Sequence, residues 1–594
     1  MKLRGFLIWK GCWRAWADGG GKKMYILWTM VKLCLLMASN FGYWEAARRK
    51  WNMNVYLLPA VTIGAQFCVM FAAGLLNYLG EAAELMYCGG LILLLWQLYR
   101  EKGRFWKLLR PYCSWGYGVF LLGMLVSLTA LRGKTLAGID NFTHWAVVVK
   151  NLLLYDRFPT FAQEAVTFTS YPLGSAAGIY YFCRHVSDGE WAFMLGQAYM
   201  MLSMLLPLFS RGRGLAAATL VAVMGNFLLC YDIPITELLV DTLLPLTAGA
   251  MLASVALGSE ETGSAIYRYS LPMLVLTLNV KNSGLFFCAG GLLLMWHLLR
   301  KQGKSLKPVL AAALVLLAVS SLWKHHCDYV FVNSRMSQHA VSMEYFQMRL
   351  GERTPEEMAR ILRGVVSYVL SRKPLGYLAA WLAAGLGCAC LTGNGKRWGI
   401  LAAVCVGLYA AWTVSLAGMY LFSMSVQEAL ELLSIERYCR TMDILLYYLL
   451  TAFCLSCLPE GCPKRWLAGG LVTALALTTW VGSCGVLATI AAPPQGDTAL
   501  RERMEEMVAE YGVEKGYSYL ICDPVAGGYA MFALRYCMNT SRVQQVAITA
   551  PEQMDIEKDY DYVFLLDTEN PILEQWVLEN YPEQAGRTVI QCIK

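Results

Sequence analysis

The sequence predicts a polytopic α-helical membrane protein, with about 13 or 14 transmembrane helices and a small α/β domain near its C-terminal end. Three observations lead to this prediction. The chain of 594 residues is 57% hydrophobic and only 15% charged, whereas a soluble domain carries about 25% charged residues. Apolar runs long enough to cross a bilayer recur along most of the chain. Charged residues are concentrated in short loops and in the C-terminal segment.

The expected spans are apolar runs close to the roughly 20 residues that a membrane helix requires. They lie at residues 24–40, 53–77, 83–99, 113–132, 191–209, 215–231, 235–257, 268–280, 283–299, 309–324, 376–392, 399–420, 441–458 and 467–488. The runs at 268–280 and 283–299 are short, so we expect a broken or tilted pair there. Segment 1–23 alternates basic and aromatic residues, and we interpret it as an interfacial amphipathic segment.

The short basic loops predict the orientation, because such loops concentrate Lys and Arg on the cytoplasmic side. These loops lie at 101–110, 210–214, 300–307, 392–398 and 461–466. With them in the cytoplasm, loops 133–190 and 325–375 and everything after about residue 489 face outward. Segment 170–186 is apolar enough to span, but a crossing there would move loop 210–214 outside. We therefore expect 170–186 to be a helix in the outer interface.

Whether the chain has 13 or 14 spans depends on whether the apolar run at 24–40 fully crosses the membrane. The basic residues at 47–50 favour the cytoplasm, which places segment 1–23 outside unless the run at 24–40 does not fully cross. The membrane domain accordingly extends over 24–490.

The segment 491–594 changes character and predicts an extracytoplasmic α/β domain. A Pro- and Gly-containing linker at 493–497 precedes a charged helical pattern. Short strand-like runs then alternate with helical stretches, and the strands are expected at 517–522, 543–549, 561–567 and 588–593. The domain contains no glycine-rich phosphate loop, so we do not assign nucleotide binding to it.

Polar residues that can do chemistry lie mainly in the predicted outer segments. Asp140 follows the apolar run 113–132, and an ionisable residue at the mouth of a span is costly unless it has a function or a partner. The alternatives for Asp140 are a helix cap or an ion pair with Arg132 or Lys134. His144 and Trp145 follow in the same loop, where an interfacial aromatic belt is the alternative to a binding site.

Further charged residues lie close to other span ends. Asp241 lies a few residues into a span, so it either pairs with a cation such as Lys281 or lines a cavity. Arg437 precedes the run 441–458; it either snorkels to the interface or clamps a phosphate, which suits the arginine fork. The run His-His-Cys-Asp at 325–328 does not place its ligands on one helix face, which disfavours a metal cluster there.

Several motifs together resemble the GT-C glycosyltransferases, in particular their uncharacterised bacterial branch. The segment IDNFTHWAVVVKNLL places Asp140 where that class has an acidic residue in the first large external loop. SYPLGSAAGIYY, with Tyr171, is similar to the proline-containing motif that follows. The pair Arg437–Tyr438 looks like the "RY" that precedes a late span, and many members end in a small external α/β domain.

The resemblance implies an enzyme that transfers a hexose or pentose from a polyprenyl-phosphate-linked donor to an extracytoplasmic glycan, lipid or protein acceptor in the cell envelope. It implies Asp140 as the base that deprotonates the acceptor hydroxyl. The residues expected to bind substrate are His144, Trp145, Lys150, Tyr171, Asp241, Lys281, Arg437 and Tyr438. Members that bind a divalent cation use paired acids. Here Asn141 replaces the second acid, which weakens that expectation, although Asp156 or Glu164 would be a substitute.

Three other functions compete with this one. A transporter or flippase for lipid-linked saccharides would show internal repeats and charges at mid-bilayer, and neither is evident. A polysaccharide ligase would use a long external loop, and loop 325–375 has suitable length. Its basic residues are Arg335, Arg349, Arg353, Arg360 and Arg363. The third alternative is a non-catalytic scaffold with the C-terminal domain as its working part.

Overall fold

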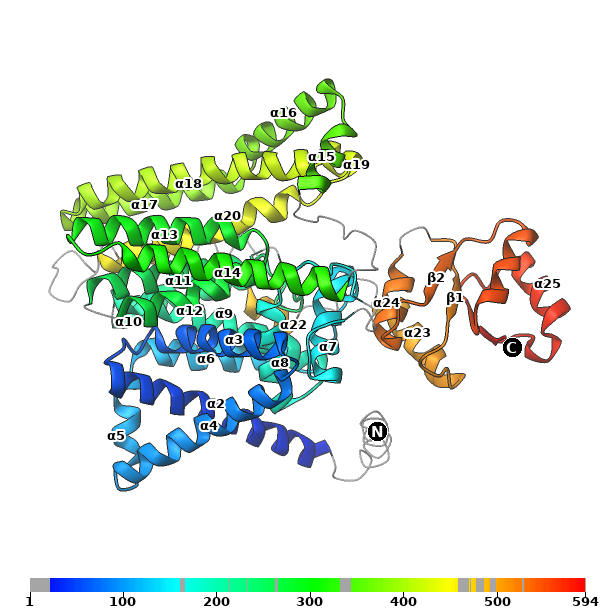
Figure 1. Ribbon diagram of the computed structural model, residues 1–594, viewed down its shortest axis with the longest axis horizontal. Coiled ribbons are helices and arrows are strands. Elements are labelled where there is room, and N and C mark those ends of the chain that lie inside the picture. Colours follow the sequence, from blue (N-terminus) through cyan, green and yellow to red (C-terminus); the bar gives the residue numbers. More distant parts are fainter. Residues whose placement is uncertain are drawn as a thin grey trace.

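The computed structural model describes residues 22–160, 166–212, 214–231, 233–261, 265–331, 343–457, 469–470, 472–476, 485–491, 498–525 and 528–592. These residues form an elongated helical bundle with a smaller α/β module at one end (Figure 1). The chain is thus a multi-pass, largely helical membrane protein, and the predicted fold class is confirmed. The N-terminal segment 1–21, the basic loop 461–466 and the linker 493–497 lie outside the described residues.

Within the described residues, nine helices are long and apolar enough to cross a membrane. They are α2 (Lys22–Trp51), α3 (Leu58–Leu75), α4 (Leu79–Arg100), α9 (Glu190–Leu205, extended by a 3-10 turn to Ser210), α11 (Leu243–Glu260), α14 (Lys307–Val330), α17 (Pro374–Thr392), α18 (Gly395–Phe422) and α20 (Ile435–Ser456). A tenth candidate is bent by 92° between Phe105–Tyr112, which contains α5 (Phe105–Leu109), and α6 (Trp115–Leu131).

This number is smaller than the number of apolar runs in the sequence, for physical reasons that differ from run to run. The helices α10 (Leu215–Leu228) and α12 (Ala265–Val280) are shorter than a span. The last turn of α13 (Gly284–Lys301) carries two basic residues. Half of the run at 467–488 lies outside the described residues.

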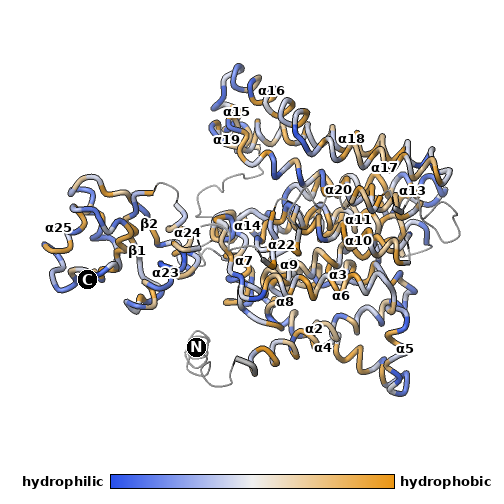
Figure 2. The backbone as a smooth tube through the Cα atoms, turned by 180° about the vertical axis from the view of Figure 1, so that it is seen from behind, coloured by the Kyte–Doolittle hydropathy of each residue, from blue (hydrophilic) through white to orange (hydrophobic). Residues whose placement is uncertain are grey.

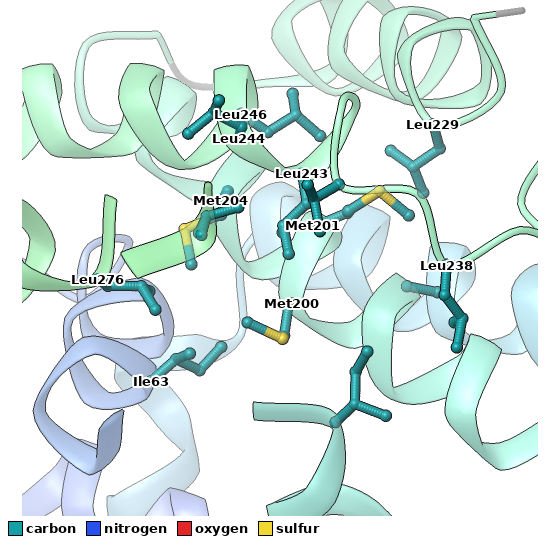
Figure 3. Packing of buried hydrophobic residues seen from close by; sticks show 14 of the residues in the cluster. Ile63, Met200, Met201, Met204, Leu229, Leu238, Leu243, Leu244, Leu246 and Leu276 are labelled. Atoms are coloured by element: carbon teal, nitrogen blue, oxygen red, sulfur yellow. The ribbon is translucent and has the colours of Figure 1, made fainter. Parts of the chain in front are cut away.

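The centre of the bundle is the helix α9, which is buried along its whole apolar length. Figure 3 shows Met204 of this helix on the side of Leu276 of α12 and Ile63 of α3, and Met201 beside Leu243 of α11. A helix that is apolar all round belongs in such a core. The apolar window of α18, in contrast, is only 17% buried, as expected of a helix whose side chains meet lipid.

The segment 170–186 is not a span. It contains α8 (Gly174–Val186), whose 13 residues are too few to cross a bilayer. Nearly all of its side chains are buried, and it packs on α7 (Ala146–Tyr155), α9, α2 and α12. The helix therefore belongs to the protein interior and supports the loop that contains Asp140.

The C-terminal module has its strands where the sequence predicts them. It consists of α23 (Thr498–Glu510), β1 (Tyr519–Cys522), α24 (Tyr529–Met538), β2 (Val543–Val546), β3 (Tyr562–Leu565), α25 (Pro571–Asn580) and β4 (Val589–Gln591). The sheet order is β2-β1-β3-β4. The central strand β1 pairs in parallel with β2 and β3, and β4 is antiparallel to β3. Figure 2 shows that this module mixes polar and apolar residues, whereas the bundle helices are mostly apolar.

The two ends of the bundle differ in character. The α/β module lies at one end, where it contacts the segment 136–155. The basic connections that contain α5 and join α17 to α18 lie at the opposite end (Figure 1). This separation matches the segregation of charged loops inferred from the sequence.

Candidate active site

The candidate site is built around Asp140, at the end of the bundle that faces the α/β module. Asp140 directly precedes a π-helical turn, Asn141–Trp145, that leads into α7. Such turns are rare and frequent at functional sites. The Asp140 Oδ2 atom accepts a hydrogen bond of 2.6 Å from Nη1 of Arg437, and the two side chains remain 42% and 26% exposed. Both groups can therefore be reached by a ligand.

Asn141 anchors the turn to a carboxylate from another part of the chain. Its amide donates a hydrogen bond to Glu237 and accepts one of 3.1 Å from the backbone N–H of Leu238. The Gly138 N–H also donates to Glu237, at 3.1 Å. Burial raises the pKa of Glu237 to about 7, against the opposing effect of these two donors. This contact between Asn141 and Glu237 was not predicted from the sequence: Asn141 stands where a second acid is expected, and it holds the Glu237 carboxyl in place.

Arg437 lies between two aspartates. It is in the first turn of α20, and its Nε atom lies 3.6 Å from Oδ2 of Asp241. The second oxygen of Asp241 accepts a hydrogen bond of 2.7 Å from Nζ of Lys281. Burial disfavours the charged carboxyl of Asp241, but Lys281 and Arg437 outweigh it and hold its pKa below the ordinary value. Asp241 thus fixes two cations side by side.

Lys281 and Arg437 share a second neighbour, the ring of Tyr438. Lys281 Nζ lies 5.0 Å from the centre of that ring, and the Arg437 guanidinium lies 5.5 Å from it. Both distances are typical of cation–π contacts. The predicted residues Asp140, Asp241, Lys281, Arg437 and Tyr438 therefore form one cluster.

An aromatic wall borders this cluster. His144, Phe168 and Tyr171 meet with ring centres 5.0 to 5.6 Å apart, and Trp145 lies 5.9 Å from Tyr171. Burial lowers the pKa of His144 to about 3, so its ring is uncharged at neutral pH. Burial and the nearby Tyr438 raise the pKa of Tyr171. Phe168 was not among the residues predicted from the sequence, because a lone Phe in a loop carries no distinctive signal.

The glycine in the SYPLG motif has a packing role. A Cβ atom on Gly174 would lie 2.5 Å from the carbonyl oxygen of Asn279. Only glycine lets the start of α8 approach the end of α12 this closely. Lys281 directly follows the last residue of α12. The motif therefore sets the distance between the aromatic wall and the two cations.

Lys150 is the one predicted site residue that the structure places elsewhere. Its ammonium donates to the carbonyl oxygens of Tyr536 and Cys537 at the end of α24, and lies over the Tyr536 ring. Lys150 thus binds the C-terminal module.

The arginines of loop 325–375 do not form a second site in the described residues. Arg353 donates to the carbonyls of Tyr420, Leu421 and Met424 and so caps the end of α18, and Arg349 pairs with Glu352. Arg335 lies outside the described residues.

The described residues contain no group of three or more His, Cys, Asp or Glu side chains arranged to hold a metal ion. Asp140 and Asp241 each pair with a cation, and Asn141 stands where a second acid would be. In the 325–328 run, Cys327 donates to the carbonyl of Thr169 and Asp328 pairs with Lys324. Glu164 lies outside the described residues.

Comparison with known proteins gives a structural likeness only. No protein-family model matches the chain, and no curated protein matches its sequence. The structure is similar to two crystal structures of ArnT from Cupriavidus metallidurans, one in the apo state and one bound to undecaprenyl phosphate. Each likeness has 12% sequence identity and covers 78% of this chain and 94% of that chain, with TM-scores of 0.36 and 0.34. The helix arrangements superpose only loosely at these scores.

Proposed function

We propose that this protein is a membrane glycosyltransferase that moves a sugar from a polyprenyl-phosphate-linked donor to a hydroxyl of an acceptor. The observation that carries the proposal is the meeting of Asp140 with Arg437 and Lys281. A partly exposed carboxylate lies beside two cations held by a buried aspartate. One group accepts a proton, and the other two stabilise a leaving phosphate.

The reaction is a single displacement at the anomeric carbon. Asp140 takes the proton of the acceptor hydroxyl as its oxygen forms the new glycosidic bond. The bond between that carbon and the phosphate oxygen breaks, and its electron pair leaves with the lipid phosphate. The configuration inverts. The released phosphate carries one more negative charge, which Arg437 and Lys281 neutralise.

The ion pair between Arg437 and Asp140 orders these events. Arg437 donates to Asp140, and its Nε makes no hydrogen bond to the described residues. A phosphate binds a guanidinium better when it accepts two parallel hydrogen bonds. The N-terminal end of α20 adds further positive potential. Donor binding therefore draws Arg437 away from Asp140 and frees the base only when the donor is present.

The surroundings fit the two parts of such a donor. Aromatic faces such as that of Tyr171 suit the apolar face of a sugar ring, either hexose or pentose. A cavity of ≈ 340 Å³ between α6, α9 and α10 is lined by apolar side chains apart from Ser127 and Asn226. It offers space for prenyl units. With the basic connections in the cytoplasm, this site faces the outer side of the membrane, where it would act on cell-envelope acceptors.

The deciding experiment uses the full-length protein in nanodiscs with undecaprenyl-phosphate-linked hexoses and pentoses. Release of undecaprenyl phosphate is measured, because it reports transfer whatever the acceptor. The wild type is expected to turn over at least one donor in the presence of cell-envelope extract. Asp140→Asn should lower that rate by about 10²- to 10⁴-fold, the usual contribution of a general base.

Binding of undecaprenyl phosphate provides the matched measurement. Asp140→Asn removes the carboxylate that competes for Arg437, so we expect this variant to bind the lipid phosphate at least as tightly as the wild type. Full transfer activity in Asp140→Asn would exclude Asp140 as the base. Weaker lipid phosphate binding would exclude the exchange of partners at Arg437.

A further inference from the structure

The C-terminal module contacts the chain immediately before Asp140. Arg501 of α23 donates to the carbonyl of Leu136 and makes a two-pronged ion pair with Glu190, at 2.7 and 2.9 Å. Glu190 also accepts a hydrogen bond of 2.8 Å from the Leu136 N–H. The Tyr529 hydroxyl of α24 donates to the carbonyl of Ala137 at 2.9 Å. The backbone leading to Asp140 is thus held at two successive residues.

Side chains of the C-terminal module also pack against the π-helical turn itself. Phe142 is 1% exposed, and its ring lies 5.2 Å from the Tyr536 ring and 5.8 Å from the Tyr529 ring. The Arg501 guanidinium lies 5.2 Å from the centre of the Phe142 ring. Phe142 and Asp140 are two residues apart, so a fixed Phe142 restricts the directions available to the Asp140 carboxylate.

The module also contacts residues that follow the turn. Lys150 reaches the carbonyls at the end of α24, and Asn539 donates to the Tyr155 hydroxyl at 3.4 Å. The module therefore contacts this segment before, within and after the turn. The cations of the site lie on other elements: Arg437 is on α20, and Lys281 follows α12.

We infer that Arg501 is a positioning residue for catalysis, because it fixes the Asp140 turn from the C-terminal module through the Leu136 carbonyl and the Phe142 ring. The inference rests on the proposed function for its effect on turnover. Asp140 must lie within hydrogen-bond reach of the acceptor hydroxyl, and a displacement of about 1 Å can cost roughly 100-fold in rate. Donor binding depends on the cations and should not require Arg501.

The test compares Arg501→Met and Arg501→Lys with Arg503→Met, an exposed arginine on the same helix. In the full-length protein, Arg501→Met should lower kcat by about 10- to 100-fold and leave the affinity for undecaprenyl phosphate unchanged. Arg501→Lys keeps a charge for Glu190 but lacks the fork that also reaches Leu136, so it should not restore kcat. Arg503→Met should behave as the wild type.

Hydrogen exchange of the peptide 136–145 gives a readout that needs no turnover. It should be about tenfold faster in Arg501→Met, whereas exchange of the first turns of α20 should stay the same. Unchanged exchange in 136–145 would overturn the inference, as would full kcat in Arg501→Lys. Faster exchange of 136–145 in Arg501→Met, together with a wild type that transfers no sugar, would refute the proposed function. That outcome would leave the role of Arg501 in positioning the turn intact.

Discussion

Two arginine–aspartate pairs each have one member on α20, and they differ in how far their side chains are exposed. Arg437 pairs with Asp140, and both side chains are partly exposed, at 26% and 42%. Asp443, six residues further along the helix, pairs with Arg372, and these side chains are 0% and 4% exposed. The first pair can exchange a partner for a ligand, and the second cannot be reached. Accessibility, more than the kind of residue, makes the first pair the candidate for ligand exchange.

The buried pair between Arg372 and Asp443 connects two parts of the helical bundle. Arg372 lies in the short break between α16 (Pro355–Ser371) and α17, and it ties that break to the middle of α20. Among the described residues, the Arg372 Nε and Nη1 atoms and one oxygen of Asp443 make no hydrogen bonds. Buried pairs of this kind contribute little net stability, but the loss of one partner leaves a costly unpaired charge.

The largest expected effect comes from breaking the buried pair. Asp443→Asn should destabilise the protein by about 3 to 5 kcal/mol, because it strands the Arg372 charge in an apolar environment. Thermal unfolding in a single detergent measures this loss. Asp140→Asn should change stability by about 0.5 kcal/mol or less, since both side chains of this pair are partly exposed to water.

A double variant is the control for that prediction. Replacing both partners, with Arg372→Met and Asp443→Leu, removes the two charges together and should recover most of the lost stability. A double variant as unstable as Asp443→Asn would show that α20 needs the ion pair itself.

Glu237 sharpens the comparison because it is buried with amide donors and without an arginine. Its folded-state pKa is raised from 4.5 to about 7, so the folded protein holds a proton that the unfolded chain releases. The contribution of Glu237 to stability should therefore be greatest below about pH 4.5, fall as pH rises toward 7, and level off above, with a total change on the order of 3 kcal/mol. Glu237→Gln should flatten that part of the profile of melting temperature against pH. A slope that persists in Glu237→Gln would assign it to another group.

A smaller effect than that of breaking the buried pair concerns donor affinity at the partly exposed pair. Arg437→Ala should weaken undecaprenyl phosphate binding by about 1.5 to 3 kcal/mol, the range for a hydrogen bond to a charged group. Arg437→Lys should recover only part of it, because an ammonium cannot make the parallel pair of hydrogen bonds. Isothermal titration in nanodiscs distinguishes the two variants, and equal affinity in Arg437→Ala and the wild type would rule out the phosphate clamp.

The sequence predicts local properties of this protein well and distant contacts poorly. The apolar runs locate most of the long helices, and strand patterns locate all four strands of the sheet, because both signals are short-range periodicities. Asp140 and Arg437 were each singled out by their position next to a span. Their direct contact across 297 positions of sequence was not predicted, and neither was the bond between Asn141 and Glu237.

Lys150 is a residue that was predicted to bind substrate and instead contacts another part of the protein. Its charge and its place after Asp140 suggest a phosphate ligand, but its ammonium binds backbone carbonyls of a helix 386 positions away. Whether a charged side chain in a loop meets substrate or protein depends on which element packs against it. A single sequence does not contain that information in readable form.

The anchoring of the Asp140 turn by α23 and α24 has a consequence for biosynthesis. In the order of synthesis, every charged member of the site, from Asp140 to Arg437, precedes the residues Arg501 and Tyr536 that hold the turn. A nascent chain that ends before Thr498 has the groups needed for the reaction but lacks Arg501 and Tyr536 to orient them. Under the proposed function, full activity therefore requires that α23 and α24 have been made and have docked on the turn.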